Sequence, residues 1–157
     1  MTRAIIYSLA ICCIGAVLEG LFAGRGIKQR LAELRLPRYA VPFWGWIIIG
    51  GLYYVICFAI LYRLFGLPPI APRNIAFALL GGIMFMNALW NYFFFRARNL
   101  FHAYVLGLSY TAFALALFLL LLLRVDPTAA WCLFPYIVYL TYANVWGYRV
   151  WKLNPAV

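Results

Sequence analysis

Five long apolar runs constrain this chain more than any other feature of its sequence. They cover about residues 4–23, 43–65, 74–95, 101–123 and 129–152, and each is close to the roughly 20 residues that a transmembrane helix needs. The chain is 68% hydrophobic and 10% charged, whereas a soluble domain is about 45–50% apolar and about 25% charged. We therefore expect an all-α integral membrane protein with a single domain over residues 1–157. The expected fold is a five-transmembrane-helix bundle with a long first loop that contains a short helix.

The first apolar run follows Arg3, as the core of a cleavable signal peptide does. However, its core is long, no small-x-small cleavage pattern follows it, and Gly15 and Gly20 suit close helix packing. We therefore interpret it as a membrane span. Glu19 is the one acidic residue inside a span. Either it lies near the membrane surface close to Arg25, which we favour, or it pairs with a loop arginine or a ligand group.

The net charge of +10 comes from thirteen Lys and Arg against three acidic residues. In a soluble protein this excess would suggest a nucleic acid partner. Here the basic residues lie in connectors between apolar runs, where membrane topology places them, so we expect no nucleic acid partner. One side holds Arg25, Lys28, Arg30, Arg35, Arg38, Arg96, Arg98, Arg149 and Lys152, and the other holds Arg3, Arg63, Arg73 and Arg124. This bias predicts that the N-terminus is outside, and that the C-terminus and first loop are cytoplasmic.

The residue types of conventional catalytic and metal sites do not cluster in this sequence. Cys12, Cys13, Cys57 and Cys132 lie inside apolar runs, and His102 is the only histidine. Neither a disulfide framework nor a metal site is predicted, and we expect no required cofactor. No paired carboxylates or Ser/His/Asp set is visible, so acid–base or hydrolytic catalysis is not expected.

The first loop, residues 24–42, contains an amphipathic segment. Ile27, Leu31 and Leu34 fall at i, i+4 and i+7 with basic residues between them. This spacing predicts a short helix that lies either on the membrane surface or over one end of the bundle.

The third and fourth runs differ in polarity. Asn87, Trp90 and Asn91 share one helical face, and we favour hydrogen bonding between helices over ligand binding for the two asparagines. Residues 112–123 are almost entirely Ala, Leu and Phe, and we expect them to face lipid.

The last run is rich in tyrosine. It contains Tyr136, Tyr139, Thr141, Tyr142, Asn144 and Tyr148. Polar atoms at membrane depth are costly unless they find partners or line a cavity. We therefore expect this helix to face protein or a ligand, with the other spans packed around it.

Several motifs together resemble one known family. They are Leu52-Tyr53, Asn87-Ala88-Leu89-Trp90, Phe94-Phe95, Ala97-Arg98, Pro135-Tyr136 and Val150-Trp151-Lys152. Over about residues 10–154 the chain resembles the TspO/MBR family, the tryptophan-rich sensory proteins and translocator proteins (peripheral benzodiazepine receptor family). The resemblance implies a five-helix bundle, often a homodimer, with a ligand cavity that the first loop closes. It also implies ligands such as porphyrin, haem, cholesterol and benzodiazepine-type compounds.

The resemblance also implies particular ligand-binding residues. By position these are Tyr39, Trp44, Trp46, Leu52, Tyr53, Asn87, Trp90, Phe94, Tyr136, Tyr139, Ala143 and Trp146. A proposed cholesterol pattern fits Val145, Tyr148 and Lys152, although a basic, aromatic helix end is also ordinary interfacial anchoring, which we favour. The family usually has tryptophan at the positions of Ile49 and Tyr139.

A membrane cavity walled by aromatic rings suits a flat apolar macrocycle or a sterol. The propionates of a porphyrin would need cations, which the loop residues Arg25, Arg35 and Arg38 are placed to supply. We predict a membrane receptor or carrier for tetrapyrroles or sterol-like lipids, with porphyrin or haem as ligand and not as a required cofactor. The alternatives are a membrane enzyme that degrades or modifies porphyrin, and a small scaffold protein.

Overall fold

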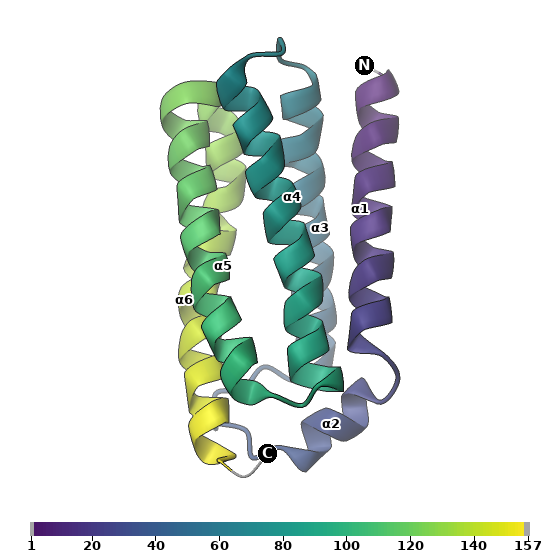
Figure 1. Cartoon of the computed structure of the whole chain (residues 1–157), viewed down its shortest axis with the longest axis vertical. Coiled ribbons are helices and arrows are strands. Elements are labelled where there is room, and N and C mark those ends of the chain that lie inside the picture. The colour runs from purple at the N-terminus through teal and green to yellow at the C-terminus, as the bar shows by residue number, and fades with distance from the viewer. Residues whose placement is uncertain (1, 156–157) are drawn as a thin grey trace.

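The computed structural model describes residues 2–155, and within this range the chain consists of helices and short connectors. The helices are α1 (Thr2–Ala23), α2 (Ile27–Glu33), α3 (Phe43–Phe65), α4 (Ala71–Asn91), α5 (Leu100–Leu120) and α6 (Pro127–Leu153). Two π-helical segments, η1 (Tyr92–Arg96) and η2 (Leu121–Val125), extend α4 and α5. Five long helices stand side by side, and the short α2 lies across one end of them (Figure 1).

Four of these helices are long and apolar enough to cross a membrane. They cover Thr2–Ala23, Phe43–Phe65, Ala71–Arg96 and Leu100–Val125, which makes this an integral, multi-pass membrane protein as predicted. The 27 residues of α6 reach about 40 Å at 1.5 Å per residue, so α6 is long enough as well. Its tyrosines and asparagine lower its mean hydropathy, so α6 is less apolar than the other four long helices. The predicted number of five spans is therefore confirmed for four helices only.

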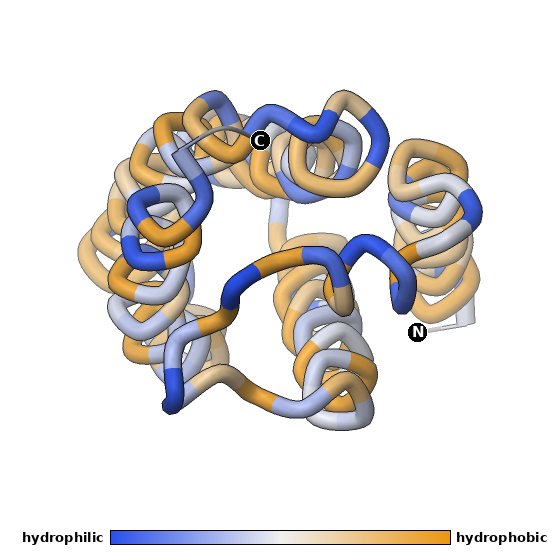
Figure 2. The backbone as a smooth tube through the Cα atoms, turned by 90° about the horizontal axis from the view of Figure 1, so that it is seen from below, coloured by the Kyte–Doolittle hydropathy of each residue, from blue (hydrophilic) through white to orange (hydrophobic). Residues whose placement is uncertain are grey.

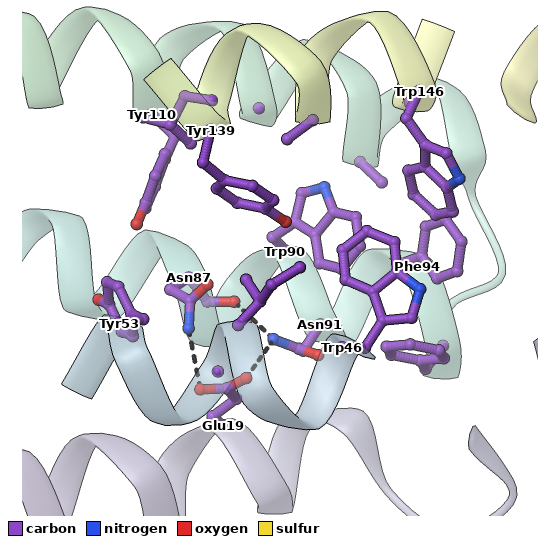
Figure 3. A pocket seen from close by; sticks show the side chains of 18 of the residues that line it. Glu19, Trp46, Tyr53, Asn87, Trp90, Asn91, Phe94, Tyr110, Tyr139 and Trp146 are labelled. Carbon is purple, nitrogen blue, oxygen red and sulfur yellow. Dashed lines mark hydrogen bonds between the residues drawn. The ribbon is translucent and has the colours of Figure 1, made fainter. Parts of the chain in front are cut away.

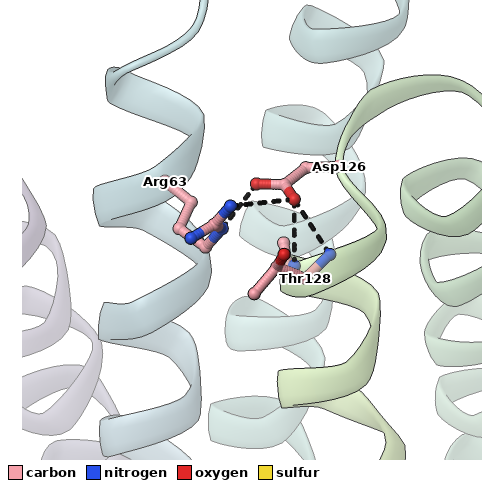
Figure 4. A network of polar contacts seen from close by, with 4 residues as sticks. Arg63, Asp126 and Thr128 are labelled. Atoms are coloured by element: carbon pink, nitrogen blue, oxygen red, sulfur yellow. Dashed lines mark hydrogen bonds and ion pairs between the residues drawn. The ribbon is translucent and has the colours of Figure 1, made fainter.

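The turn from α5 into α6 depends on one carboxylate, that of Asp126. Its side chain accepts hydrogen bonds from the backbone N–H groups of Thr128 and Ala129, and Pro127 fills the first helical position (Figure 4). The same carboxylate accepts two hydrogen bonds from the guanidinium of Arg63 on α3. One residue therefore begins α6 and fixes its end against α3.

The long helices form a ring. The helix α1 packs against α3 and α4, α5 lies between α4 and α6, and α6 returns to α3. Near the turn between α3 and α4, the centre of the ring is filled by side chains that are almost fully buried, including Ile60, Leu64, Leu80, Leu117 and Leu121. The half of the bundle beside α2 is packed differently, by a smaller aromatic cluster that contains Phe94 and Trp146.

The predicted lipid exposure of residues 112–123 is wrong for one face of α5. Ala114, Leu117 and Leu121 are 0% exposed and belong to the core, whereas Phe113 and Leu119 are 42% and 52% exposed. In a membrane both faces of a helix are apolar, so residue type alone does not distinguish them. The spacing of the three buried residues at i, i+3 and i+7 is the signal that marks the inner face.

The predicted short helix in the first loop exists as α2, and it folds over the end of the bundle. Gly24 and Gly26 have φ values of 70° and 98°, which glycine adopts at little cost and which turn the chain sharply after α1. Seen along the helices in Figure 2, this segment crosses the end of the ring. We call residues 27–42 the lid.

Candidate functional site

The half of the bundle beside the lid contains a partly open cavity of about 340 Å³. Side chains from all six helices line it, with the first half of α3 and the second half of α6 as two long walls. Its volume falls at the lower end of the roughly 300–1,000 Å³ of ligand pockets.

One wall of the cavity consists of closely packed aromatic rings. The ring centroids of Trp90 and Phe94 are 4.8 Å apart, those of Trp46 and Trp146 are 4.9 Å apart, and those of Phe94 and Trp146 are 5.5 Å apart. Phe94 and Trp146 are each 2% exposed. Contacts of this kind hold rings in fixed orientations, so the wall presents a rigid aromatic surface.

A second wall consists of tyrosines from three helices. The ring centroid of Tyr136 lies 5.2 Å from that of Tyr53 and 5.5 Å from that of Tyr139. The hydroxyls of Tyr110 and Tyr136 are hydrogen-bonded to each other at 2.8 Å. This pairing satisfies two polar atoms that are buried at membrane depth.

A third wall is polar and centres on Glu19 of α1. The Glu19 Oε2 accepts hydrogen bonds from the Tyr54 hydroxyl at 2.7 Å and from the Asn87 amide at 2.9 Å. The Glu19 Oε1 accepts one from the Asn91 amide at 3.1 Å. Figure 3 shows the carboxylate and the two amides on one side of the cavity, with Tyr139 and Trp146 across from them. The two asparagines therefore bond between helices, as predicted, and also line the cavity.

The lid covers one end of the cavity through apolar contacts and is fastened by hydrogen bonds to α6 and to Asn154, which follows α6. Ile27 and Leu31 of α2 line the cavity. The backbone of Arg35 exchanges two hydrogen bonds of 3.0 Å with the Asn154 side chain. The Tyr142 hydroxyl accepts a hydrogen bond from the Val41 N–H and donates one to a lid carbonyl, both at 3.2 Å.

A buried arginine ties the lid to the loop after η1. Arg30 is 3% exposed, and its guanidinium lies 3.7 Å from the Glu33 carboxylate and 3.5 Å from the Arg98 carbonyl. The Arg98 guanidinium also reaches Glu33, at 3.3 Å. Burial, and then the neighbouring charge of Arg98, lower the pKa of Arg30 below its ordinary value. The carboxylate of Glu33 therefore joins two arginines from separate loops.

The structure brings nine of the twelve predicted ligand-binding residues together around the cavity. These are Trp46, Tyr53, Asn87, Trp90, Phe94, Tyr136, Tyr139, Ala143 and Trp146. Trp44 and Leu52 instead lie on the outer face of α3, 66% and 57% exposed, and the 47% exposed Tyr39 lies on the lid outside the cavity. Trp44 is two residues from Trp46, which places it about 200° around the helix, on the opposite side.

Sixteen of the 25 residues that line the cavity were not among the predicted ligand-binding residues. They include Glu19, Asn91, Tyr104, Gly107 and Tyr110. The last three share the inner face of α5 with the buried Ala114. Gly107, Tyr110 and Ala114 repeat the i, i+3, i+7 spacing, and Tyr104 lies about one turn before Gly107, so this spacing could have identified them. Among the described residues Glu19 pairs with no arginine, so the predicted alternative of a loop arginine as its partner is wrong. Its partners lie 35 to 72 residues away, and nothing local in the sequence indicates them.

The basic residues predicted to hold carboxylates do not reach the cavity. Arg25, Arg35 and Arg38 are exposed, and none of them lines the cavity. Val145 and Tyr148 of the proposed sterol pattern are 51% and 41% exposed on the outer surface of α6. Within residues 2–155, no three His, Cys, Asp or Glu side chains gather closely enough to hold a metal ion.

A model of the TspO/MBR family matches residues 8–152, which is nearly the whole chain. The chain belongs to the TspO/MBR family. Among curated proteins, no sequence matches it. Membership of the TspO/MBR family supports a membrane role in binding tetrapyrroles or sterols at the level of the family. The two positions at which TspO/MBR proteins usually carry tryptophan, Ile49 and Tyr139, both line the cavity here, and Trp46 lies on the same side of α3 one turn from Ile49.

Proposed function

We propose that this protein is a membrane receptor or carrier that binds a flat, largely apolar ligand, a tetrapyrrole or a sterol-like lipid, in the cavity beneath the lid. The observation that carries the proposal is the wall of closely packed rings, Trp46, Trp90, Phe94 and Trp146, beside a partly open cavity of about 340 Å³. Such a wall offers large, rigid faces to a ring system and costs little conformational entropy on binding.

The area available supports useful affinity. Removing about 300 Å² of apolar ligand surface from water contributes roughly 7–8 kcal/mol, before the cost of ordering the ligand. A free energy of about −8 kcal/mol corresponds to a micromolar Kd. The proposed binding therefore needs no covalent or metal-mediated contact.

The charges around the cavity favour one orientation for a tetrapyrrole that carries propionates. No cationic side chain is among the described residues that line the cavity, whereas α2 and the rest of the lid carry basic residues on their outer surface. Carboxylates are stabilised by nearby cations. In this proposal the apolar part of the macrocycle enters the cavity and the propionates stay at its lid end.

We also propose that α6 is a fifth membrane span and that the lid faces the cytoplasm. The Tyr136 and Tyr142 hydroxyls of α6 are hydrogen-bonded to Tyr110 and to the lid, so the lower hydropathy of α6 is compatible with a spanning helix. Nine of the thirteen basic residues lie at the lid end, which supports a cytoplasmic lid.

The proposal is tested by titrating the purified protein with protoporphyrin IX while its tryptophan fluorescence is recorded. Saturable quenching is expected at micromolar concentrations. Trp46→Leu removes a ring from the cavity wall and should weaken binding about tenfold, the effect of roughly 1.4 kcal/mol of lost stacking and burial. Trp44→Leu is the matched control, because it removes an exposed ring from the same helix turn.

Two outcomes contradict this proposal. Absence of saturable quenching at tens of micromolar rejects porphyrin binding. Equal weakening by Trp44→Leu and Trp46→Leu rejects the cavity as the place of binding.

A further inference from the structure

We propose that Glu19 recognises a protonated amine on the ligand, so that the preferred ligand is a flat aromatic or polycyclic molecule with one cationic nitrogen. This inference rests on the proposed function and adds a chemical requirement to it. It follows from the position of the Glu19 carboxylate, its charge, and the partners that it has.

Glu19 is the only residue with a formal charge at neutral pH among the described residues that line the cavity. It lies across the cavity from Tyr139 and Trp146 (Figure 3). A ligand that rests on the aromatic wall therefore has one charged protein group within reach of its edge, and that charge is negative.

The partners of Glu19 within the protein are neutral. Its three donors are a tyrosine hydroxyl and two asparagine amides, and the ion pairs in the described part of the chain involve only Glu33 and Asp126. Neutral donors satisfy lone pairs but leave the net charge in place. A charge in surroundings of low dielectric constant is attracted to a counter-ion more strongly than it would be in water.

The carboxylate also has room for one more donor. An ionised carboxylate offers about four lone-pair positions. Two donors occupy Oε2, while Oε1 accepts only the Asn91 amide. An ammonium group at Oε1 would make a charge-assisted hydrogen bond and supply the missing positive charge, whereas a ligand carboxylate at the same place would be repelled.

A shallow surface hollow of about 270 Å³ also borders this carboxylate. It is lined by Ala16, Gly20, Ala23 and Tyr54, and it shares Glu19, Asn91 and Ile27 with the cavity. Small side chains on α1 leave this open space beside the carboxylate. A polar head group therefore has room next to Glu19 while the apolar body of the ligand occupies the cavity.

The test compares two probes with the same ring system, 1-pyrenemethylamine, which is protonated at neutral pH, and 1-methylpyrene, which is not. Energy transfer from tryptophan to pyrene reports binding to the detergent-solubilised protein. Glu19→Gln keeps the size of the side chain and one acceptor oxygen but removes the charge. We expect the ratio of the two affinities to fall at least about tenfold in Glu19→Gln, the scale of one charge-assisted hydrogen bond, with 1-methylpyrene binding unchanged.

Two controls isolate the local effect. Partition of each probe into detergent is the same for both proteins, so it cancels when the ratios are compared. Glu33→Gln removes the same charge outside the cavity. Because Glu33 ties the lid to Arg98, this variant can change both affinities together, but it should keep the wild-type ratio. An affinity ratio that is the same in wild type and Glu19→Gln would overturn the inference. This includes an equal loss of affinity for both probes, which is the result expected if Glu19 only joins helices.

The wild-type protein supplies an independent measurement if Glu19→Gln does not fold. Adding 1-pyreneacetic acid to the series, the expected order of affinity, corrected for partition, is amine, then neutral, then acid. The reverse order overturns the inference. If wild-type protein binds 1-methylpyrene but does not prefer the amine, only the role of Glu19 is rejected. If it binds neither 1-methylpyrene nor protoporphyrin IX, the proposed function is rejected.

Discussion

At the scale of single residues, a few polar side chains join segments that lie far apart in the sequence. Asp126 begins α6 and pairs with Arg63 of α3, Glu19 joins α1 to α3 and α4, and Asn154 holds the lid. Each of them works inside or beside an apolar bundle, where a lost hydrogen bond is not replaced by water. Substitutions at these few positions should therefore affect the protein more than most substitutions of its apolar residues on the outer surface.

Asp126 gives a prediction for the dependence of stability on pH. Burial alone would raise the pKa of Asp126, but hydrogen bonds from Arg63 and from the Ala129 and Thr128 backbone outweigh it, so the pKa lies below its ordinary value. A lowered folded-state pKa means that the carboxylate stabilises the fold above the unfolded pKa of about 4. This stabilisation is lost as the pH falls through the lowered pKa.

Asp126→Asn isolates the charge, because asparagine caps a helix about as well as aspartate does. We expect the melting temperature at pH 7 to fall by about 2–4 °C, the effect of about 1 kcal/mol in a chain of this size. The difference between wild type and variant should disappear at acidic pH. A difference that stays constant from pH 7 to pH 3 in detergent-solubilised protein would contradict this assignment.

At the scale of elements, the sequence predicted the helices well and their orientation poorly. The second run, predicted at 43–65, coincides with α3 (Phe43–Phe65), because long apolar runs and flanking prolines mark helix ends. Which face of α3 turns inward was not predictable from residue type, since lipid and protein are both apolar partners. Trp44 and Trp46 are both tryptophans, but they lie on opposite faces of α3. Only long-range contacts, such as that between Trp46 and Trp146, show which of the two faces inward.

The lid gives a prediction about the rate of ligand release. Leu31 lines the cavity and Ala32 faces outward, so Leu31→Gln weakens the apolar closure while Ala32→Gln leaves it intact. We expect ligand dissociation to be about tenfold faster in Leu31→Gln, from roughly 1.4 kcal/mol of lost burial. Stopped-flow recovery of tryptophan fluorescence after displacement of protoporphyrin IX measures this rate. Equal rates in the two variants would show that α2 does not control release.

At the scale of the whole molecule, the bundle is divided into a packed half and a hollow half. The half near the turn between α3 and α4 buries a continuous aliphatic core, while the half beside the lid holds the cavity and most of the basic residues. Long apolar runs predicted the helices but not the cavity, because a cavity depends on how the helices meet. The family resemblance supplied that part of the prediction.

The same division gives a prediction for orientation in the membrane. In a protein whose four cysteines are replaced by alanine, Gln29→Cys places a thiol on the exposed face of the lid and Pro69→Cys places one at the opposite end. A membrane-impermeant maleimide added to intact cells should label only Pro69→Cys, and both variants should be labelled after lysis. Labelling of Gln29→Cys in intact cells would reverse the proposed orientation.

The attachment of the lid to Asn154 has a consequence for biosynthesis. Arg35 and Asn154 are 119 residues apart in the sequence, and Val41 meets Tyr142 from 101 residues away. During translation the lid and the walls contributed by α3 and α4 are made well before the segment that fastens them. The newly made chain therefore passes through a stage in which its aromatic wall is incomplete and its lid is unattached, and the lid can be fastened only after the end of α6 has left the ribosome.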